Sequence, residues 1–251
     1  MSFRISLVGR VIEIHSTYKK LYNMCQNYII SEDIKSEPDI IIDITDNDLQ
    51  NEFAKTNKEQ NPTISQMLFN MRKPSLECIA AMYKIAGELL NYDTILLHGV
   101  VISRESKGFM FSGSSGIGKS TRAMVWREVY PESSIINGDK PFIHLMQDGV
   151  YAYGSPWCGK EGWNENTKVP LQAIFLIERS DGDTIETIHR INNSNAFPEL
   201  LKQTLRFDDK EKMKKNLNLL EALNEKVGIY KLHSGPTKEA IRLAYNTAQK
   251  S

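Results

Sequence analysis

The feature that most restricts the fold of this sequence is a glycine-rich stretch near the middle of the chain. Residues 113–120 read Gly-Ser-Ser-Gly-Ile-Gly-Lys-Ser and match the pattern GxxxxGK[ST] in full. In this pattern the glycines let backbone N–H groups turn toward phosphate oxygens without a Cβ clash. The lysine reaches the β- and γ-phosphates, and the final hydroxyl binds Mg²⁺. The stretch therefore predicts a P-loop that binds a nucleoside triphosphate together with Mg²⁺.

The flanking segments predict the secondary structure that a P-loop requires. Residues 95–102 are apolar and predict one buried strand, and residues 109–111 predict a second strand after a polar turn. Residues 120–130 are typical of a short helix, which Pro131 ends, and the positive end of that helix favours phosphate. The predicted nucleotide-binding residues are Gly113, Ser114, Ser115, Gly116, Ile117, Gly118, Lys119, Ser120 and Thr121.

The first third of the chain predicts a smaller, separate lobe. Residues 5–14 and 39–44 are rich in Ile and Val, as strands are. Residues 47–63 are polar and predict a solvated loop, in which a helical turn or a linker between lobes stays open. Apolar positions recur at helical spacing over residues 75–90, and Pro74 fits the start of that helix.

Beyond the predicted P-loop helix, short strands come first and helices follow. The expected strands are residues 134–137, 142–146, 150–153, 171–177 and 228–232. The expected helices are residues 197–205, 210–227 and 237–248. We therefore expect an α/β protein, with an N-terminal α+β lobe over residues 1–90 and a nucleotide-binding core with C-terminal helices over residues 91–251.

Composition disfavours several classes of partner. Lys plus Arg and Asp plus Glu total 31 each, so no net charge attracts the chain to nucleic acid or to anionic lipid. No stretch approaches the roughly 20 apolar residues of a membrane span. The three cysteines lack metal-ligand spacing and indicate reduced thiols. We expect a cytoplasmic protein without nucleic-acid or membrane partners, and assembly into a homo-oligomer stays open.

Asp139 and His98 are candidates for the chemistry of the site. Asp139 follows a predicted strand, at the kind of position where ligands bind in open α/β sheets. There it could bind the metal with Ser120 or accept a proton from an acceptor hydroxyl, although a turn aspartate beside Gly138 is the alternative. His98 lies among apolar residues, where a histidine is more often a hydrogen-bonded core residue than a catalyst.

Taken together, these residues resemble the kinase/phosphorylase of the phosphocarrier protein HPr, whose P-loop core is related to that of phosphoenolpyruvate carboxykinase. The resemblance covers residues 97–139: a Leu-His-Gly-Val stretch, a hairpin, the glycine-rich loop, a helix and a strand that ends before an aspartate. It implies this type of P-loop kinase core, an active-site role for His98, and catalytic or metal-binding roles for Asp139. The family has a second aspartate where this sequence has Lys140.

Within that family, the chain looks more like the shorter members that act in peptide maturation. The signature of the HPr-binding loop is not recognisable, so neither HPr as substrate nor the reverse phosphorylase reaction follows from the resemblance. The size of the chain and its N-terminal lobe are similar to those of the shorter members.

The expected function is an ATP-dependent kinase that transfers the γ-phosphate to a hydroxyl, with Ser of a peptide or protein favoured. Lys119 and Mg²⁺ would neutralise charge, and Asp139 would act as base. A small-molecule kinase on the same core is one alternative, and a nucleotide-binding regulator without catalysis is another. The loop of residues 154–163, with Trp157, Lys160 and Trp163, is expected to contact the acceptor.

Overall fold

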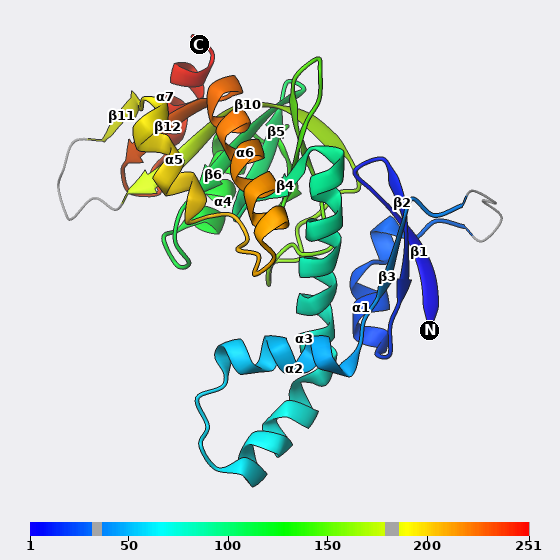
Figure 1. Cartoon of the computed structure of the whole chain (residues 1–251). Coiled ribbons are helices and arrows are strands. Elements are labelled where there is room, and N and C mark those ends of the chain that lie inside the picture. The colour runs from blue at the N-terminus through cyan, green and yellow to red at the C-terminus, as the bar shows by residue number, and fades with distance from the viewer. Residues whose placement is uncertain (32–36, 179–185, 251) are drawn as a thin grey trace. The chain divides into compact units, whose positions relative to one another are not determined.

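The chain forms two compact units, Met1–Glu88 and Leu89–Ser251, in a computed structural model that describes residues 1–31, 37–178 and 186–250. The first unit contains a three-stranded sheet in the order β1-β2-β3 (Figure 1). Strands β1 (Ser2–Leu7) and β2 (Arg10–His15) form an antiparallel hairpin, and β3 (Ile40–Asp43) pairs with β2 in parallel. The helices of this unit are α1 (Lys19–Met24), η1 (Gln26–Tyr28), α2 (Asp46–Thr56) and α3 (Pro62–Leu89), the last of which ends at the first residue of the second unit.

Helix α2 contradicts the predicted solvated loop over residues 47–56, whereas residues 57–61 form a loop between α2 and α3. The hydroxyl of Thr45 accepts the N–H of Asp48, and the Asp48 carboxylate accepts the N–H of Thr45, which closes a capping box. Phe53 of α2 is buried in an apolar cluster with side chains of α3. The helix forms because it has both a cap and an apolar face, which the abundance of polar residues conceals.

Helix α3 begins at Pro62 instead of after Pro74, so the predicted start is wrong. The Asn61 carboxamide oxygen accepts the N–H groups of Thr63 and Ile64 at 3.0 and 3.2 Å. Pro62 occupies the first helical position, where a missing N–H removes no intrahelical bond. Pro74 is accommodated inside the helix, in which the flanking turns are held by packing of their apolar side chains.

In the described part of the second unit, nine strands form one mixed sheet (Figure 1). Their order is β4-β8-β9-β10-β6-β5-β7, and β12 pairs with β10 while β11 pairs with β12. The strands are β4 (Thr94–Leu96), β5 (Gly99–Arg104), β6 (Lys107–Ser112), β7 (Ser134–Asn137), β8 (Phe142–Leu145), β9 (Val150–Tyr153), β10 (Lys168–Glu178), β11 (Thr187–Arg190) and β12 (Gly228–His233).

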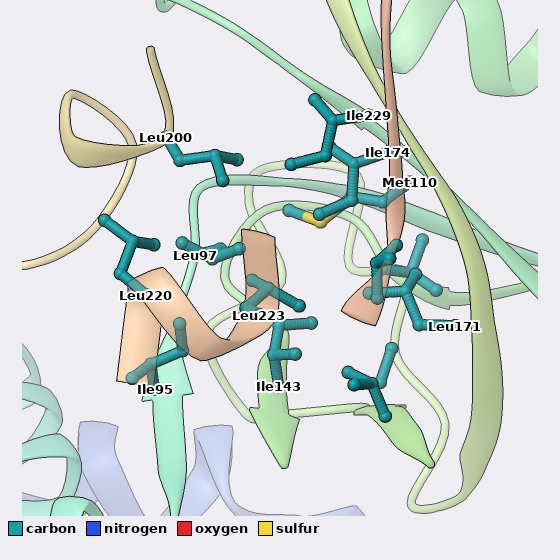
Figure 2. Packing of buried hydrophobic residues seen from close by; sticks show 14 of the residues in the cluster. Ile95, Leu97, Met110, Ile143, Leu171, Ile174, Leu200, Leu220, Leu223 and Ile229 are labelled. Atoms are coloured by element: carbon teal, nitrogen blue, oxygen red, sulfur yellow. The ribbon is translucent and has the colours of Figure 1, made fainter. Parts of the chain in front are cut away.

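Alternation along β10 shows that apolar side chains cover both faces of this sheet. Ala173, Phe175 and Ile177 belong to a buried cluster with α4 and α7, whereas Ile174 and Leu176 belong to one with α5 and α6. Figure 2 shows Leu220 and Leu223 of α6 among side chains of the cluster that contains Ile174. The described helices of the second unit are η2 (Leu90–Tyr92), α4 (Lys119–Val129), α5 (Asn193–Leu201), α6 (Lys210–Lys226) and α7 (Lys238–Ala248).

The predicted strand over residues 95–102 is divided into β4 and β5, because the chain changes its pairing partner at His98. Strand β4 pairs with β8, whereas β5 pairs with β6 and β7. Between them, the His98 N–H donates to the Gln203 carbonyl at 2.7 Å. The break places His98 at a strand end instead of inside a continuous apolar strand.

Most other predicted elements of the second unit are confirmed, including the hairpin of β5 and β6 and the helices α4, α6 and α7. Helix α5 begins at Asn193 instead of residue 197 because Asn192 caps it, accepting the N–H of Asn195 at 3.0 Å. Strand β11 was not predicted. Among the described residues, no helix combines the length and apolar character needed to cross a membrane.

Candidate functional site

The glycine-rich loop, residues 113–118, joins β6 to the N-terminal end of α4. Gly116 and Gly118 have φ angles of +76° and +99°, a region that residues with a Cβ atom rarely adopt. Gly118 is the N-cap residue of α4, and no side chain caps this end. In contrast, α6 and α7 are capped by the side chains of Asp209 and Thr237. Within the described residues, the first-turn N–H groups of α4 therefore have no side-chain acceptor, as an anion site requires.

Lys119, the first residue of α4, is only 8% exposed. Its Nζ donates to the carbonyl oxygens of Gly113 and Ser114 at 2.9 and 3.0 Å. Burial lowers the pKa of Lys119 to about 8, although the nearby Asp139 carboxylate opposes this shift. The loop thus holds the ammonium group at the helix end through its own backbone.

A cavity of about 560 Å³ opens beside the loop and α4. Six of the nine predicted nucleotide-binding residues line it: Ser115, Gly116, Gly118, Lys119, Ser120 and Thr121. The other three do not. Gly113 and Ser114 act through the carbonyls that hold Lys119, and Ile117 packs against the apolar cluster under α4.

His98 and Asp139 line the same cavity and contact each other. His98 Nε2 lies 3.2 Å from Asp139 Oδ1, and the Gly99 N–H donates to the Asp139 carbonyl at 2.8 Å. Burial raises the pKa of Asp139, but the hydrogen bond and electrostatic attraction of His98 and the positive charges of Lys140 and Lys119 outweigh it, so the pKa is lowered overall. The carboxylate is therefore ionised at neutral pH and can accept a proton or bind a cation.

Two buried residues that the sequence patterns did not indicate, Asn137 and Ser155, shape the turn at Asp139. Asn137, the last residue of β7, accepts the N–H groups of Asp139 and Lys140 with its side-chain oxygen, at 2.9 and 2.7 Å. Its Nδ2 donates to the carbonyl and the hydroxyl of Ser155 at 3.0 and 3.1 Å. The order Asn-Gly-Asp signals such a turn, but nothing local in the sequence signals the partner at Ser155.

The loop of residues 154–163 contributes charged groups to the cavity, but its tryptophans do not line it. Trp157 is 8% exposed and packs against Phe142, with ring centroids 6.4 Å apart. Trp163 packs against the apolar cluster under α4. Neither ring lines the cavity, because Trp157 is buried and Trp163 is half-buried against that cluster, so their contact with an acceptor stays a prediction. Lys160 and Glu161 do line the cavity.

Comparisons with known proteins add little to this geometry. Neither a family model nor a curated protein matches the sequence. Among solved structures, the chain is similar to the Hpr(Ser) kinase/phosphatase from Coxiella burnetii, with 8% sequence identity and a TM-score of 0.36. The match covers 62% of this chain and 88% of that chain. This likeness is too slight to indicate a function for the chain.

The cavity residues fit a nucleotide phosphate with its metal ion. The uncapped end of α4 and the Lys119 ammonium suit phosphate oxygens, and the Ser120 hydroxyl and Asp139 carboxylate are oxygen donors of the kind that Mg²⁺ prefers. In the part of the chain that the structure describes, no three His, Cys, Asp or Glu side chains cluster as metal ligands. Mg²⁺ in phosphate-transfer sites needs no such cluster, since one or two protein ligands, substrate phosphates and waters complete its shell.

Proposed function

We propose that this protein is an ATP-dependent kinase that transfers the γ-phosphate to a hydroxyl of a peptide or protein. The observation that carries the proposal is one cavity in which Lys119 and the uncapped end of α4 are combined with the Asp139–His98 pair. The first set of groups suits an anion, and the second suits proton transfer. A kinase needs both within one space.

On the phosphate side, the chain would bind and orient the transferred group. Lys119 would exchange its carbonyl partners in the loop for phosphate oxygens, and the N–H groups of the first turn of α4 would donate to the same group. Ser120 and Asp139 would hold Mg²⁺, which when bound would neutralise charge on the phosphates.

On the acceptor side, Asp139 is the candidate base. The acceptor oxygen would form a bond to phosphorus as the bond from phosphorus to ADP breaks, and the hydroxyl proton would pass to the Asp139 carboxylate. The contact of 3.2 Å with His98 orients this carboxylate. Lys160 and Glu161, at the same cavity, would contact polar groups of the acceptor chain.

The proposal is tested by incubating the protein with Mg²⁺ and ATP labelled at the γ-phosphate. Peptides with Ser, Thr or Tyr would be compared with small hydroxyl compounds as acceptors. We expect label in a peptide with the wild type and none with Lys119→Ala. Lys107→Ala is the matched control, because Lys107 contacts Gln249 and does not line the cavity. Label in small compounds alone would assign the protein to the small-molecule kinases.

One observation favours a second candidate, a nucleotide-binding regulator without catalysis. Lys140 stands directly after Asp139, and burial lowers its pKa overall, although the Asp139 carboxylate opposes this shift. A cation next to Asp139 weakens the attraction of that carboxylate for a metal ion. Slow ATP hydrolysis at one rate with every acceptor would support the regulator over the kinase.

A further inference from the structure

A network of buried hydrogen bonds joins the turn at Asp139 to the loop that carries Lys160. Asn137 and Ser155 are both fully buried. The side-chain oxygen of Asn137 accepts two N–H groups of the turn, and its nitrogen donates twice to Ser155. Its hydrogen-bonding capacity is therefore divided between the two segments.

Ser155 completes the connection from the loop side. Its hydroxyl donates to the Lys140 carbonyl at 2.6 Å and accepts the N–H of Trp157 at 3.2 Å. The Lys140 N–H also donates to the Trp157 carbonyl at 3.0 Å. The turn and the start of the loop thus each donate hydrogen bonds to the other.

The hydrogen bonds keep the two segments from moving apart, and close backbone contacts keep them from moving closer together. A Cβ atom on Gly138 would lie 2.6 Å from the Cys158 carbonyl oxygen, and one on Gly159 would lie 3.3 Å from Asp139 Cβ. The turn is therefore in contact with the loop at Gly138 and again at Asp139. A displacement of the loop near Ser155 would be transmitted to the carboxylate.

We propose that Asn137 and Ser155 are positioning residues, which hold Asp139 Oδ1 against His98 and fix Lys160 and Glu161 relative to that carboxylate. Their catalytic meaning rests on the proposed kinase function, whereas the positioning itself does not. Asp139 and the loop of residues 154–163 then form one hydrogen-bonded unit. An acceptor bound to the loop would therefore find the Asp139 carboxylate already correctly positioned.

The test is Ser155→Ala, which removes the hydroxyl and leaves the backbone carbonyl that Asn137 also contacts. The first measurement is the ¹⁵N NMR spectrum of the His98 imidazole, assigned with His98→Gln. In the neutral ring, a hydrogen bond from Nε2–H to Asp139 favours one tautomer, which separates the shifts of the two nitrogens. We expect the two shifts to move toward each other in Ser155→Ala, because the Asp139 contact weakens.

The second measurement is kinetic. We expect turnover of the Ser155→Ala variant to fall by about 10- to 100-fold, with the dissociation constant of Mg-ATP changed less than about twofold, because the glycine-rich loop is untouched. Ser133→Ala is the matched control. Ser133 is a buried serine whose hydroxyl accepts Trp126 Nε1–H. It directly precedes the first residue of β7, whereas Asn137 is the last residue of that strand.

The two measurements separate this inference from the proposed function. Unchanged His98 shifts in Ser155→Ala, or an equal change in Ser133→Ala, would overturn the positioning role whatever the activity. Changed shifts in Ser155→Ala alone support it even if no acceptor is phosphorylated by the wild type, an outcome that would reject only the kinase.

Discussion

Lys119 shows how strongly one residue of this site depends on its surroundings. Its ammonium group is buried and held by two backbone carbonyls, and its pKa is lowered to about 8. Phosphate oxygens would add negative charge beside it and raise that pKa again, so nucleotide binding and protonation of Lys119 are linked.

This linkage predicts that Mg-ATP affinity falls as pH rises above about 8. Below that pH Lys119 already carries its charge in the free protein, whereas above it binding must take up a proton, at a cost of up to about tenfold in affinity per pH unit. Calorimetry in buffers of different ionisation enthalpy would measure both the affinity and the proton uptake. In Lys119→Arg, which stays charged, the uptake should vanish. The same uptake in both proteins would show that another group titrates.

A second prediction concerns Asp139, whose proposed work lies in the transition state and at the metal. We expect Asp139→Asn to lower turnover by roughly 10²- to 10⁴-fold and to weaken Mg-ATP binding far less, as steady-state kinetics and calorimetry would show. Asp148→Asn is the control, since Asp148 contacts only the Tyr151 hydroxyl among the contacts described for it and does not line the cavity. Wild-type turnover in Asp139→Asn would return Asp139 to the role of a turn residue.

Among the structural elements, the loop of residues 154–163 divides into a buried part and an exposed part. Trp157 and Ser155 belong to the packing and hydrogen bonding beneath the loop, and Lys160 and Glu161 line the cavity. Recognition of an acceptor is therefore expected from the charged tip and not from the aromatic rings.

Accordingly, Lys160→Ala should raise the KM for the acceptor by about three- to tenfold, the effect of one lost charged contact, while the KM for ATP stays within about twofold. Initial rates at varied acceptor and ATP concentrations would show the difference. Lys168→Ala serves as control, because Lys168, on β10, lies near the ring of Tyr151, on β9, and does not line the cavity. An unchanged KM for the acceptor would remove Lys160 from the acceptor site.

Sequence patterns predicted elements with contiguous signals and failed where partners distant in sequence decide. The glycine-rich loop and α4 follow from one local motif and its apolar flank. The break at His98 arises because the chain exchanges β8 for β6 and β7 as pairing partners, and the Asn137–Ser155 contact depends on the arrangement of the loop after β9. Neither pairing leaves a local trace in composition or periodicity.

At the scale of the whole molecule, the two units can be followed separately. The chain has three tryptophans, Trp126, Trp157 and Trp163, and all belong to the second unit, Leu89–Ser251. Tryptophan fluorescence therefore reports the unfolding of the unit with the cavity, whereas far-UV circular dichroism reports helices and strands of both units.

We expect Mg-ATP to raise the midpoint of the urea transition seen by fluorescence, by the equivalent of about 2.7 kcal/mol at a nucleotide concentration one hundred times the dissociation constant. If the first unit folds independently, as the predicted lobe would, a separate component of the circular dichroism transition should stay unchanged by nucleotide. Lys119→Ala, denatured with and without Mg-ATP, is the control and should show no shift. A nucleotide-dependent shift of the entire circular dichroism signal would instead mean that the two units unfold together.

The backbone contacts of two glycines also restrict which substitutions evolution can accept at their positions. A Cβ atom on Gly99 would lie 2.7 Å from the Phe111 carbonyl oxygen, and one on Gly138 would lie 2.6 Å from that of Cys158. Neither obstacle is a side chain that could turn away, whereas at Gly235 the nearest atom is a Thr237 methyl at 3.5 Å. In a library that encodes all amino acids at these codons, selection for function should return only glycine at the first two and several residues at the third.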